Sequence, residues 1–385
     1  MHHNVVIASR ARTPIGSFQG ALSALSAPDL GAVAIQAAVS RAGLSGSDID
    51  EVLMGQVITA GVGQAPARQA ALKAEIPVSV PCTTVNKVCG SGLKAVMLAT
   101  QSIQLGEAKI AVAGGMESMS NAPYLLPKAR FGYRMGNQQV VDSILHDGLL
   151  DPSSKSHMGV FGDLCATEFK FSREEQDAFA KTSYERALAA QKNGYFNAEI
   201  IPVLVDQDEE PKNYKPEKMS LLKPAFEASG TVTAANASKI NDGAAAVVVM
   251  SEAEAQKRSI RPLAKIISMA TFAQDPAHFT TAPASAIELA LKKAGLALSD
   301  IDFFEINEAF SVVAMACMKK LNLDQARVNV WGGAVALGHP IGCSGARLLC
   351  TLVSILQHHQ AKRGCVAICL GGGEAVAMII ERSGS

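Results

Sequence analysis

The stretch AIQAAVSRAGLSGSDID, residues 34–50, returns as AIELALKKAGLALSDID at residues 286–302. The offset is 252 residues, no gap is needed, and ten of the 17 positions are identical. Chance would give about one or two identities at ordinary residue usage. Each copy predicts an amphipathic helix, a glycine stop and a turn that leads into a strand. The chain therefore contains a duplicated α/β unit.

The correspondence continues more loosely beyond the two helices. CGSGLKAVM (89–97) is echoed by GCSGARLLC (342–350), and each copy predicts small residues followed by a helix. An apolar strand and a glycine turn then follow in both halves, as IAVAGGMES (110–118) and VAICLGGGEAVAMII (366–380). This order predicts two related α/β domains with mainly parallel or mixed sheets.

The region between the halves differs from both. Residues 120–239 hold more charge, most of the tyrosines and a helix whose start is marked by Ser172 with Glu175 three positions later. Such an insertion is typical of a substrate-binding lobe. We expect a first domain of residues 1–119 with 240–262, a loop domain of residues 120–239 and a second domain of residues 263–385.

Composition excludes several classes of partner. Lys plus Arg equals Asp plus Glu at 35 each, so the net charge favours neither nucleic acid nor an anionic membrane. No apolar run reaches the ~20 residues of a membrane helix, and the start does not resemble a signal peptide. Eight cysteines in such a chain are typical of reduced thiols. We expect a cytoplasmic protein.

Cys89 raises the question of a nucleophile. It lies among small residues just before a predicted helix at residues 91–106. Free N–H groups and the helix dipole at that end stabilise a thiolate, so we expect a lowered thiol pKa. Taken alone, a buried structural cysteine is the commoner interpretation.

His339 and Cys369 are further candidates. Pro340 restricts His339 to extended backbone conformations, which orients the imidazole, although a packed loop histidine is an equal alternative. Cys369 ends a predicted strand and precedes three glycines. Their N–H groups could form an oxyanion hole or cradle a phosphate. Neither a P-loop nor a dinucleotide-binding glycine motif is present.

Three other features carry weaker signals. Asn307 follows a predicted strand in the segment NEAF, where a buried amide needs a hydrogen-bond partner. Glu305 and Glu308 could form a general-acid pair, although structural or solvated carboxylates are commoner. His157 opens a helix and alone indicates only a capping or solvent-facing histidine.

Together these segments resemble the thiolase family, in particular its acetyl-CoA acetyltransferases. The resemblance covers essentially the whole chain. It implies two similar domains in a layered α-β-α-β-α sandwich, a loop domain over the active site, and a homotetramer built as a dimer of dimers. The matching segments are VNKVCGSGLKA, AGGMESMSNAPY, HMG, GTVTAANASKINDGAAA, NEAF, GGAVALGHPIGCSGAR and CLGGG.

The resemblance implies a ping-pong reaction in which two acetyl-CoA molecules give acetoacetyl-CoA and CoA, or the reverse. Cys89 would carry the acyl group, His339 would accept its proton, and Cys369 would be the second acid and base. One oxyanion hole would use His339 and a water held by Asn307. The other would use the N–H groups of Cys89 and Gly371. No covalent cofactor is implied.

The resemblance also implies binding sites for CoA and for potassium. Phe279 matches a position that tolerates an α-methyl group, which would admit 2-methylacetoacetyl-CoA. The implied substrate and CoA residues are His157, Ser238, Lys218, Phe279, Ala309 and Phe310. Lysines at 212, 215, 218 and 223 would meet the CoA phosphates, a solvated loop being the alternative. The nearest subtype is potassium-activated, and the implied ion ligands are Tyr184, Ala234, Ala235, Ala237 and Val335.

Some alternatives stay open. Glu374 departs from the family's commoner GGGMG or GGGGA and has no assigned role. A β-ketoacyl synthase would replace Cys369 by histidine or asparagine, and a non-catalytic acyl-CoA or lipid carrier would lack a reactive residue. A degradative 3-ketoacyl-CoA thiolase of broader chain length is the nearest rival, because loop shape decides chain length. The direction of the reaction in the cell is also left open.

Overall fold

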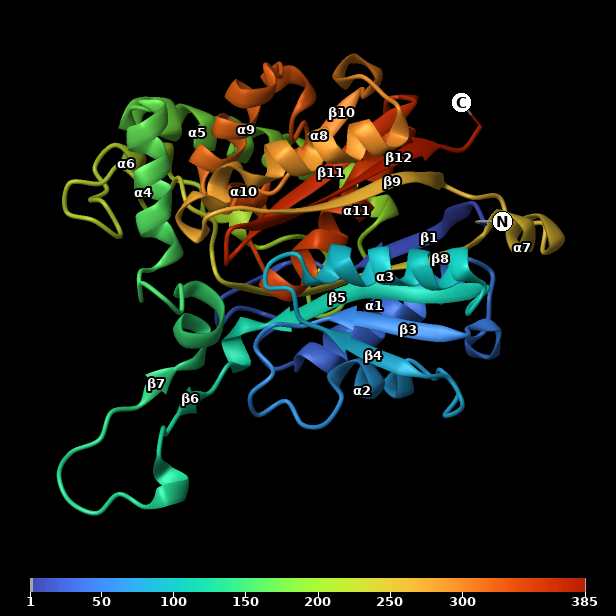
Figure 1. Cartoon of the computed structure of the whole chain (residues 1–385), viewed down its shortest axis with the longest axis horizontal. Coiled ribbons are helices and arrows are strands. Elements are labelled where there is room, and N and C mark those ends of the chain that lie inside the picture. Colours follow the sequence, from blue (N-terminus) through green and yellow to red (C-terminus); the bar gives the residue numbers. More distant parts are fainter. Residues whose placement is uncertain (1–2, 385) are drawn as a thin grey trace.

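The computed structural model describes residues 3–384, and one mixed sheet of ten strands runs through both copies of the repeat (Figure 1). The strands of this sheet are β1 (Val5–Arg12), β2 (Gly16–Ser17), β3 (Glu51–Gly55), β4 (Cys82–Val85), β5 (Ile110–Ser118), β8 (Asn241–Ser251), β9 (Ala264–Ala273), β10 (Phe303–Ile306), β11 (Arg363–Leu370) and β12 (Glu374–Arg382). Their order is β10-β11-β12-β9-β1-β8-β5-β3-β4, and β2 pairs with β8 beside this path.

The helices pack on both faces of this sheet. No helix within residues 3–384 is long and apolar enough to cross a membrane. The helices are α1 (Ala27–Arg41), α2 (Pro66–Lys73), α3 (Ser91–Leu105), α4 (Met158–Phe169), α5 (Arg173–Lys192), α6 (Pro216–Met219), α7 (Glu252–Lys257), α8 (Ala282–Ala294), α9 (Ser311–Leu321), α10 (Ala334–Leu337) and α11 (Ile341–His358).

The molecule is layered because the two halves of the sheet join only at its centre, where β1 and β9 share two residue pairs. The halves stack with α3 and α11 between them, and the central apolar cluster takes residues from both helices and both halves. Helices α1 and α2 cover one outer face and α8 covers the other (Figure 1). The predicted α-β-α-β-α sandwich is confirmed.

The duplication is visible at the level of single hydrogen bonds. In the first half β3 runs parallel to β5, which is antiparallel to β8, and the second half repeats this with β10, β11 and β12. Asp50 Oδ2 accepts from the backbone N–H groups of Lys109 and Ile110. Asp302, its counterpart in the repeat, accepts in the same way from Lys362 and Arg363. The strand predicted at residues 243–250 is β8, buried along its whole length.

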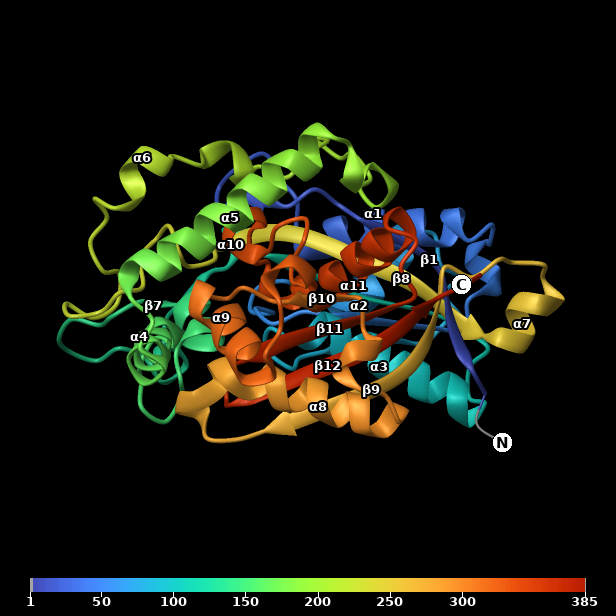
Figure 2. The same ribbon diagram turned by 90° about the horizontal axis from the view of Figure 1, so that it is seen from above.

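The insertion lies at one end of the sandwich. Figure 2 shows α5 packed along α10, and α4 nearby at the same end. Helix α5 begins at the predicted cap, where Ser172 and Glu175 exchange side-chain and backbone hydrogen bonds. A short ladder of β6 (Tyr124–Leu125) and β7 (Val141–Asp142) starts an arm that projects away from the body (Figure 1).

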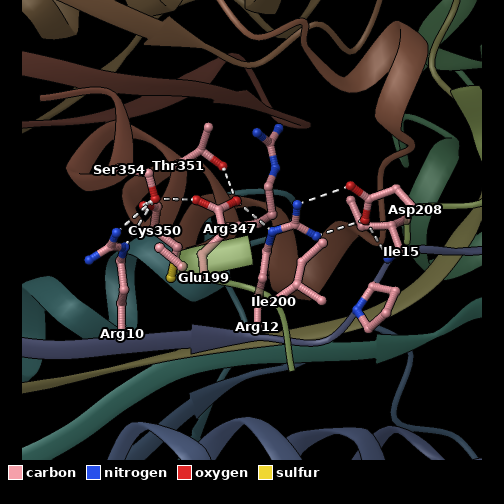
Figure 3. A network of polar contacts seen from close by, with 12 residues as sticks. Arg10, Arg12, Ile15, Glu199, Ile200, Asp208, Arg347, Cys350, Thr351 and Ser354 are labelled. Carbon is pink, nitrogen blue, oxygen red and sulfur yellow. Dashed lines mark hydrogen bonds and ion pairs between the residues drawn. The ribbon is translucent and has the colours of Figure 1, made fainter. Parts of the chain in front are cut away.

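A buried ion network fastens the insertion to the sandwich (Figure 3). Arg12, on β1, is fully buried and donates to Glu199 at 2.7 Å and to Asp208 at 2.7 and 3.0 Å. Both carboxylates belong to the insertion. Thr351 and Ser354, on α11, donate to the same Glu199. Because every charge has a partner, the network can remain ionised without contact with water.

Candidate active site

Two helix N-termini meet at the centre of the sandwich because glycine lets their backbones touch. A Cβ at Gly92 would lie 2.9 Å from the carbonyl oxygen of Gly342, and one at Gly115 only 2.0 Å from the same oxygen. Cys89 precedes the first residue of α3 by two positions, and His339 precedes the first residue of α11 by two. The close approach of α3 and α11 therefore brings both side chains to one cavity.

This cavity has a volume of about 490 Å³ and lies between the sandwich and the insertion. Its wall is mostly apolar, with a few polar groups that converge on it, as in many small-molecule sites. The sequence-predicted residues that line it are Cys89, His157, Ala234, Ala237, Ser238, Phe279, Ala309, Phe310, His339 and Gly371.

Cys89 lies on a tight turn with an unusual backbone. Val88 has a φ of +45°, a conformation that β-branched residues rarely adopt. The backbone N–H groups of Gly371 and of Cys89 itself act to lower the pKa of the Cys89 thiol. Burial nevertheless raises the pKa of the Cys89 thiol to about 12. The expectation of a lowered pKa is wrong for this state, because the loss of hydration outweighs the helix dipole and the N–H donors. The resting group is a thiol and needs a base.

His339 is set up as that base. Ser344 Oγ donates to the Pro340 carbonyl oxygen at 2.9 Å, so it accepts from His339 Nδ1 at 2.5 Å. This assigns the proton to Nδ1 and leaves a lone pair on Nε2. Burial, with a smaller effect of the Arg347 charge, lowers the pKa of His339 to about 3. A neutral imidazole with a free Nε2 can accept a proton from a thiol.

Asn307 connects the end of β10 to this imidazole. Its amide nitrogen lies 3.3 Å from His339 Nε2, and its side chain is fully buried. The other end of the amide, Oδ1, has no partner within residues 3–384. A buried polar atom without a protein partner is a place for an ordered water or a substrate group. In the neutral state Oδ1 of Asn307 can accept a hydrogen bond from a water or a substrate group, and His339 could donate from Nε2 only after it takes up a proton.

Cys369 lies at the end of β11, buried in an apolar cluster with Phe279, Ala309 and Phe310. Burial raises the pKa of Cys369 well above its ordinary value, and the charge of Cys89 raises it further. The residues that follow the two cysteines touch, since a Cβ at Gly90 would lie 2.6 Å from Leu370 Cδ2, so the two turns are adjacent. The two cysteines come from segments 280 residues apart in the sequence.

The unassigned Glu374 has a structural partner. Its carboxylate forms an ion pair with Lys87 Nζ. Lys87 lies two residues before the predicted nucleophile, and Glu374 opens β12 directly after the glycine turn that follows Cys369. The ion pair thus ties together the two turns that carry the reactive sulfurs, one from each half of the duplication.

The two glutamates near Asn307 are structural. Glu305 is buried and pairs with Arg347 at 3.5 Å. Glu308 is buried and accepts from Ser183 Oγ at 2.7 Å, from Asn329 Nδ2 at 2.8 Å and from a backbone N–H of α10. Neither lines the cavity, so the general-acid interpretation of this pair has no support in the structure.

The predicted CoA-phosphate lysines do not meet the cavity. Lys212, Lys215, Lys218 and Lys223 are all exposed, and Lys212 already pairs with Glu209 at 3.2 Å. None of the four belongs to the cavity wall within the described residues. A contact between Lys218 and CoA stays a prediction.

The predicted potassium site needs correction. Lys239 Nζ lies 2.8 Å from the Tyr184 hydroxyl, 2.9 Å from the Ala237 carbonyl oxygen and 3.0 Å from the Val335 carbonyl oxygen. These atoms are three of the five predicted ligands, and the other two belong to the adjacent residues 234–235. The ammonium binds three of these oxygens, so a potassium ion bound to the same three would meet a like charge at contact distance.

The sequence analysis did not identify two residues of this site, Lys239 and Ser344. Lys239 had a signal, since a lysine within the small and apolar run of residues 230–250 is unusual for a buried segment. Ser344, which orients His339, had none, because a serine in the first turn of a helix is ordinary.

The comparisons with known proteins agree with this site. The model of the N-terminal thiolase domain matches residues 5–253, and that of the C-terminal thiolase domain matches residues 260–382. The chain belongs to the thiolase family. It is 52% identical to an acetyl-CoA acetyltransferase of Schizosaccharomyces pombe over 98% of both chains. It is 50% identical to one of Cupriavidus necator, over 98% of this chain and 99% of that protein.

A solved structure is also similar over the whole chain. The crystal structure of a thiolase from Ascaris suum in complex with coenzyme A superimposes with a TM-score of 0.95. The two sequences are 46% identical, and the match covers 98% of this chain and 100% of the other.

Proposed function

We propose that this protein is an acetyl-CoA C-acetyltransferase, which condenses two acetyl-CoA molecules to acetoacetyl-CoA and CoA and also catalyses the reverse thiolysis. One observation carries the proposal: Cys89 and His339 line one cavity together with Gly371, which follows Cys369 by two residues. The acetyl-CoA acetyltransferases among its relatives support the same reaction.

The first half-reaction forms an acyl-enzyme. Cys89 Sγ attacks the thioester carbonyl of acetyl-CoA while its proton passes to His339 Nε2. The N–H groups of Cys89 and Gly371 are our candidates for the oxyanion hole, and their effect on the pKa of the Cys89 thiol supports this assignment. The C–S bond to CoA then breaks, and the departing CoA thiolate takes the proton of Cys369. The products are an acetylated Cys89, a protonated His339 and a Cys369 thiolate.

The second half-reaction makes the carbon–carbon bond. The Cys369 thiolate removes an α-proton from a second acetyl-CoA, and the protonated His339 with Asn307 stabilises the resulting enolate. The enolate carbon attacks the acetyl group on Cys89. Acetoacetyl-CoA leaves as the Cys89–carbonyl bond breaks, and Cys89 recovers its proton from His339. Both thiols end as they began, in agreement with their raised pKa values.

A substrate comparison tests this function. Thiolysis of acetoacetyl-CoA, 2-methylacetoacetyl-CoA and a longer 3-ketoacyl-CoA would be measured under one set of conditions. We expect the highest kcat/KM with acetoacetyl-CoA, because Phe279 and Phe310 limit the cavity beside the sulfurs. An equal or higher kcat/KM with the longer chain would favour a degradative 3-ketoacyl-CoA thiolase.

Replacing Cys369 by alanine should separate the two half-reactions. We expect Cys369→Ala to accept an acetyl group from acetyl-CoA, seen by intact-protein mass spectrometry, while kcat falls by about 10²–10⁴-fold, the usual contribution of a general acid or base. Cys365→Ala is the matched control, since that thiol is also buried on β11 but belongs to a different apolar cluster, outside the cavity. Turnover of Cys369→Ala close to that of the control would remove Cys369 from the mechanism.

We propose a homotetramer for the assembly. The arm at residues 122–143 projects from the body (Figure 1). It carries a group of exposed apolar side chains, a common sign of a protein interface. Phe131→Ser with Met135→Ser should reduce the mass in sedimentation analysis to that of a dimer. A wild-type protein that sediments as a monomer would refute the proposal. The exposed apolar residues of the arm are Tyr124, Leu126, Phe131, Tyr133, Met135 and Val140.

We also propose that residues 120–239 form the CoA-binding loop domain between a first domain of residues 1–119 with 240–262 and a second of residues 263–385. His157 and Ser238 support this role, because both belong to the insertion and both lie in the cavity wall. For the cellular location we propose the cytoplasm, since a relative from Gibberella zeae, 52% identical, is named cytosolic.

A further inference from the structure

Lys239 has an unusual environment for a lysine. Its ammonium has three N–H donors, and all three find neutral oxygen acceptors at 2.8–3.0 Å: one phenol and two backbone carbonyls. Among the described residues it makes no contact ion pair. The carboxylates that influence it, Glu210 and Glu308, are hydrogen-bonded to other groups. Such neutral oxygen ligands are those that a weakly hydrated monovalent cation takes.

The three acceptors come from three separate elements. Tyr184 lies on α5 of the insertion, where its ring also stacks on Tyr214 at 4.7 Å between ring centroids. Ala237 precedes Ser238 in the cavity wall, and Val335 lies on α10, four residues before His339. The ammonium therefore joins the insertion, the loop beside the substrate cavity and the segment that carries the base.

Two buried carboxylates also connect Lys239 with the segment that carries Val335 and His339. The backbone N–H of His339 donates to Asn241 Oδ1 at 2.9 Å, and Asn241 Nδ2 donates to Glu210 Oε1 at 3.0 Å. Glu308 accepts from the backbone N–H of Val335. The two buried carboxylates thus hold the segment of residues 335–339, and the charge of Lys239 compensates theirs.

We propose that the Lys239 ammonium is a built-in monovalent cation, which positions residues 234–238 and the His339 segment around the acyl-CoA and makes the enzyme independent of dissolved potassium. The proposal rests on the proposed acetyltransferase function. Lys239 also lines the cavity, but its ammonium is bound by the three oxygens, so we treat it as a positioning residue that acts through Ser238 and His339. A lysine with a purely structural role would stabilise the fold, and its removal would not make KM depend on which salt cation is present.

The test is to remove the ammonium and offer a free ion in its place. Lys239→Ala leaves the three oxygen acceptors and opens space among them. In sodium chloride we expect KM for acetoacetyl-CoA and CoA to rise by about tenfold or more, the equivalent of one lost charged hydrogen bond. Potassium or rubidium chloride at equal ionic strength should restore KM along a saturation curve. Wild-type kinetics should be the same in all of these salts.

Two further variants sharpen the experiment. Lys239→Met keeps most of the stem and fills the space without charge, so its raised KM should not respond to potassium. Lys265→Ala is the matched control, a partly buried lysine on β9 far from the cavity, and should behave as wild type in every salt. Activation of the wild type by potassium over sodium would overturn the proposal. So would a Lys239→Ala variant that is fully active in sodium, or one whose defect no monovalent cation reduces.

A crystallographic readout does not depend on activity. Crystals of Lys239→Ala soaked in a rubidium salt should show an anomalous peak among the Tyr184, Ala237 and Val335 oxygens, and wild-type crystals should show none there. If Lys239→Ala fails to fold, a rubidium peak at this place in the wild type still refutes the proposal, and its absence with salt-independent kinetics supports it. Should the wild type lack thiolase activity, the proposed function fails, whereas the rubidium experiment still decides the cation site.

Discussion

The Cys89→Ala variant is expected to form no acyl-enzyme and to lose at least about 10⁴ in kcat/KM, the scale seen when a covalent nucleophile is removed. The wild type incubated with acetyl-CoA should gain the mass of one acetyl group, and peptide mapping should place it on Cys89. The reason is geometric: this sulfur reaches the cavity beside His339, and the N–H of Gly371 acts to lower the pKa of its thiol.

Cys82→Ala is the control for this result, because Cys82 is a partly buried free thiol on β4 outside the cavity. It should acylate and turn over as the wild type does. Acetyl label on any side chain other than Cys89, or a labelled Cys89→Ala protein, would contradict the mechanism at its first step. Retained folding of the variant can be checked by its circular dichroism spectrum.

The Arg12→Met variant is expected to lose about 3–5 kcal/mol of stability, the cost of breaking a buried ion pair from one side. Among residues 3–384, Arg12 is the only cation that forms an ion pair with the carboxylates of Glu199 and Asp208, and both would remain buried without it (Figure 3). Methionine fills similar space, so the loss would come from the uncompensated charges. Urea unfolding of variant and wild type at one protein concentration measures the difference.

Arg258→Met is the matched control for Arg12. Arg258 also pairs with two carboxylates, Asp48 and Glu254, but it lies at the surface. Its replacement should cost no more than about 1 kcal/mol, because exposed ion pairs are screened by water. If the two variants lose equal stability, the network does not hold the insertion as described. Faster proteolysis within residues 120–239 of Arg12→Met would locate the effect in the insertion.

Much of the fold could be predicted because the duplicated units have the same local sequence patterns. The paired helices α1 and α8, the glycines that end them and the aspartates at positions 50 and 302 depend on short-range periodicity and turn chemistry. The strand β8, which returns to the first half after the insertion, could be placed because an uninterrupted apolar run requires burial on both faces.

For the candidate site, the sequence predicted which side chains line the cavity better than it predicted their ionisation and contacts. The reactive side chains came from sequence motifs, and the cavity brings Cys89, His339 and Gly371 together. The sequence suggested the wrong direction for the Cys89 pKa, because a helix N-terminus can be predicted locally while desolvation depends on what the rest of the chain packs over the thiol. The role of Glu374 was open for a similar reason: its partner Lys87 lies 287 residues away in sequence.

The sequence by itself determined that two α/β units are stacked and which side chains are candidates for the chemistry, since periodicity and motifs are local properties. Only the tertiary structure decided the protonation states of Cys89 and His339 and the place of the Lys239 ammonium. These depend on distances and on the exclusion of water between segments remote in the chain, and Coulomb energy and hydration are set by three-dimensional neighbours.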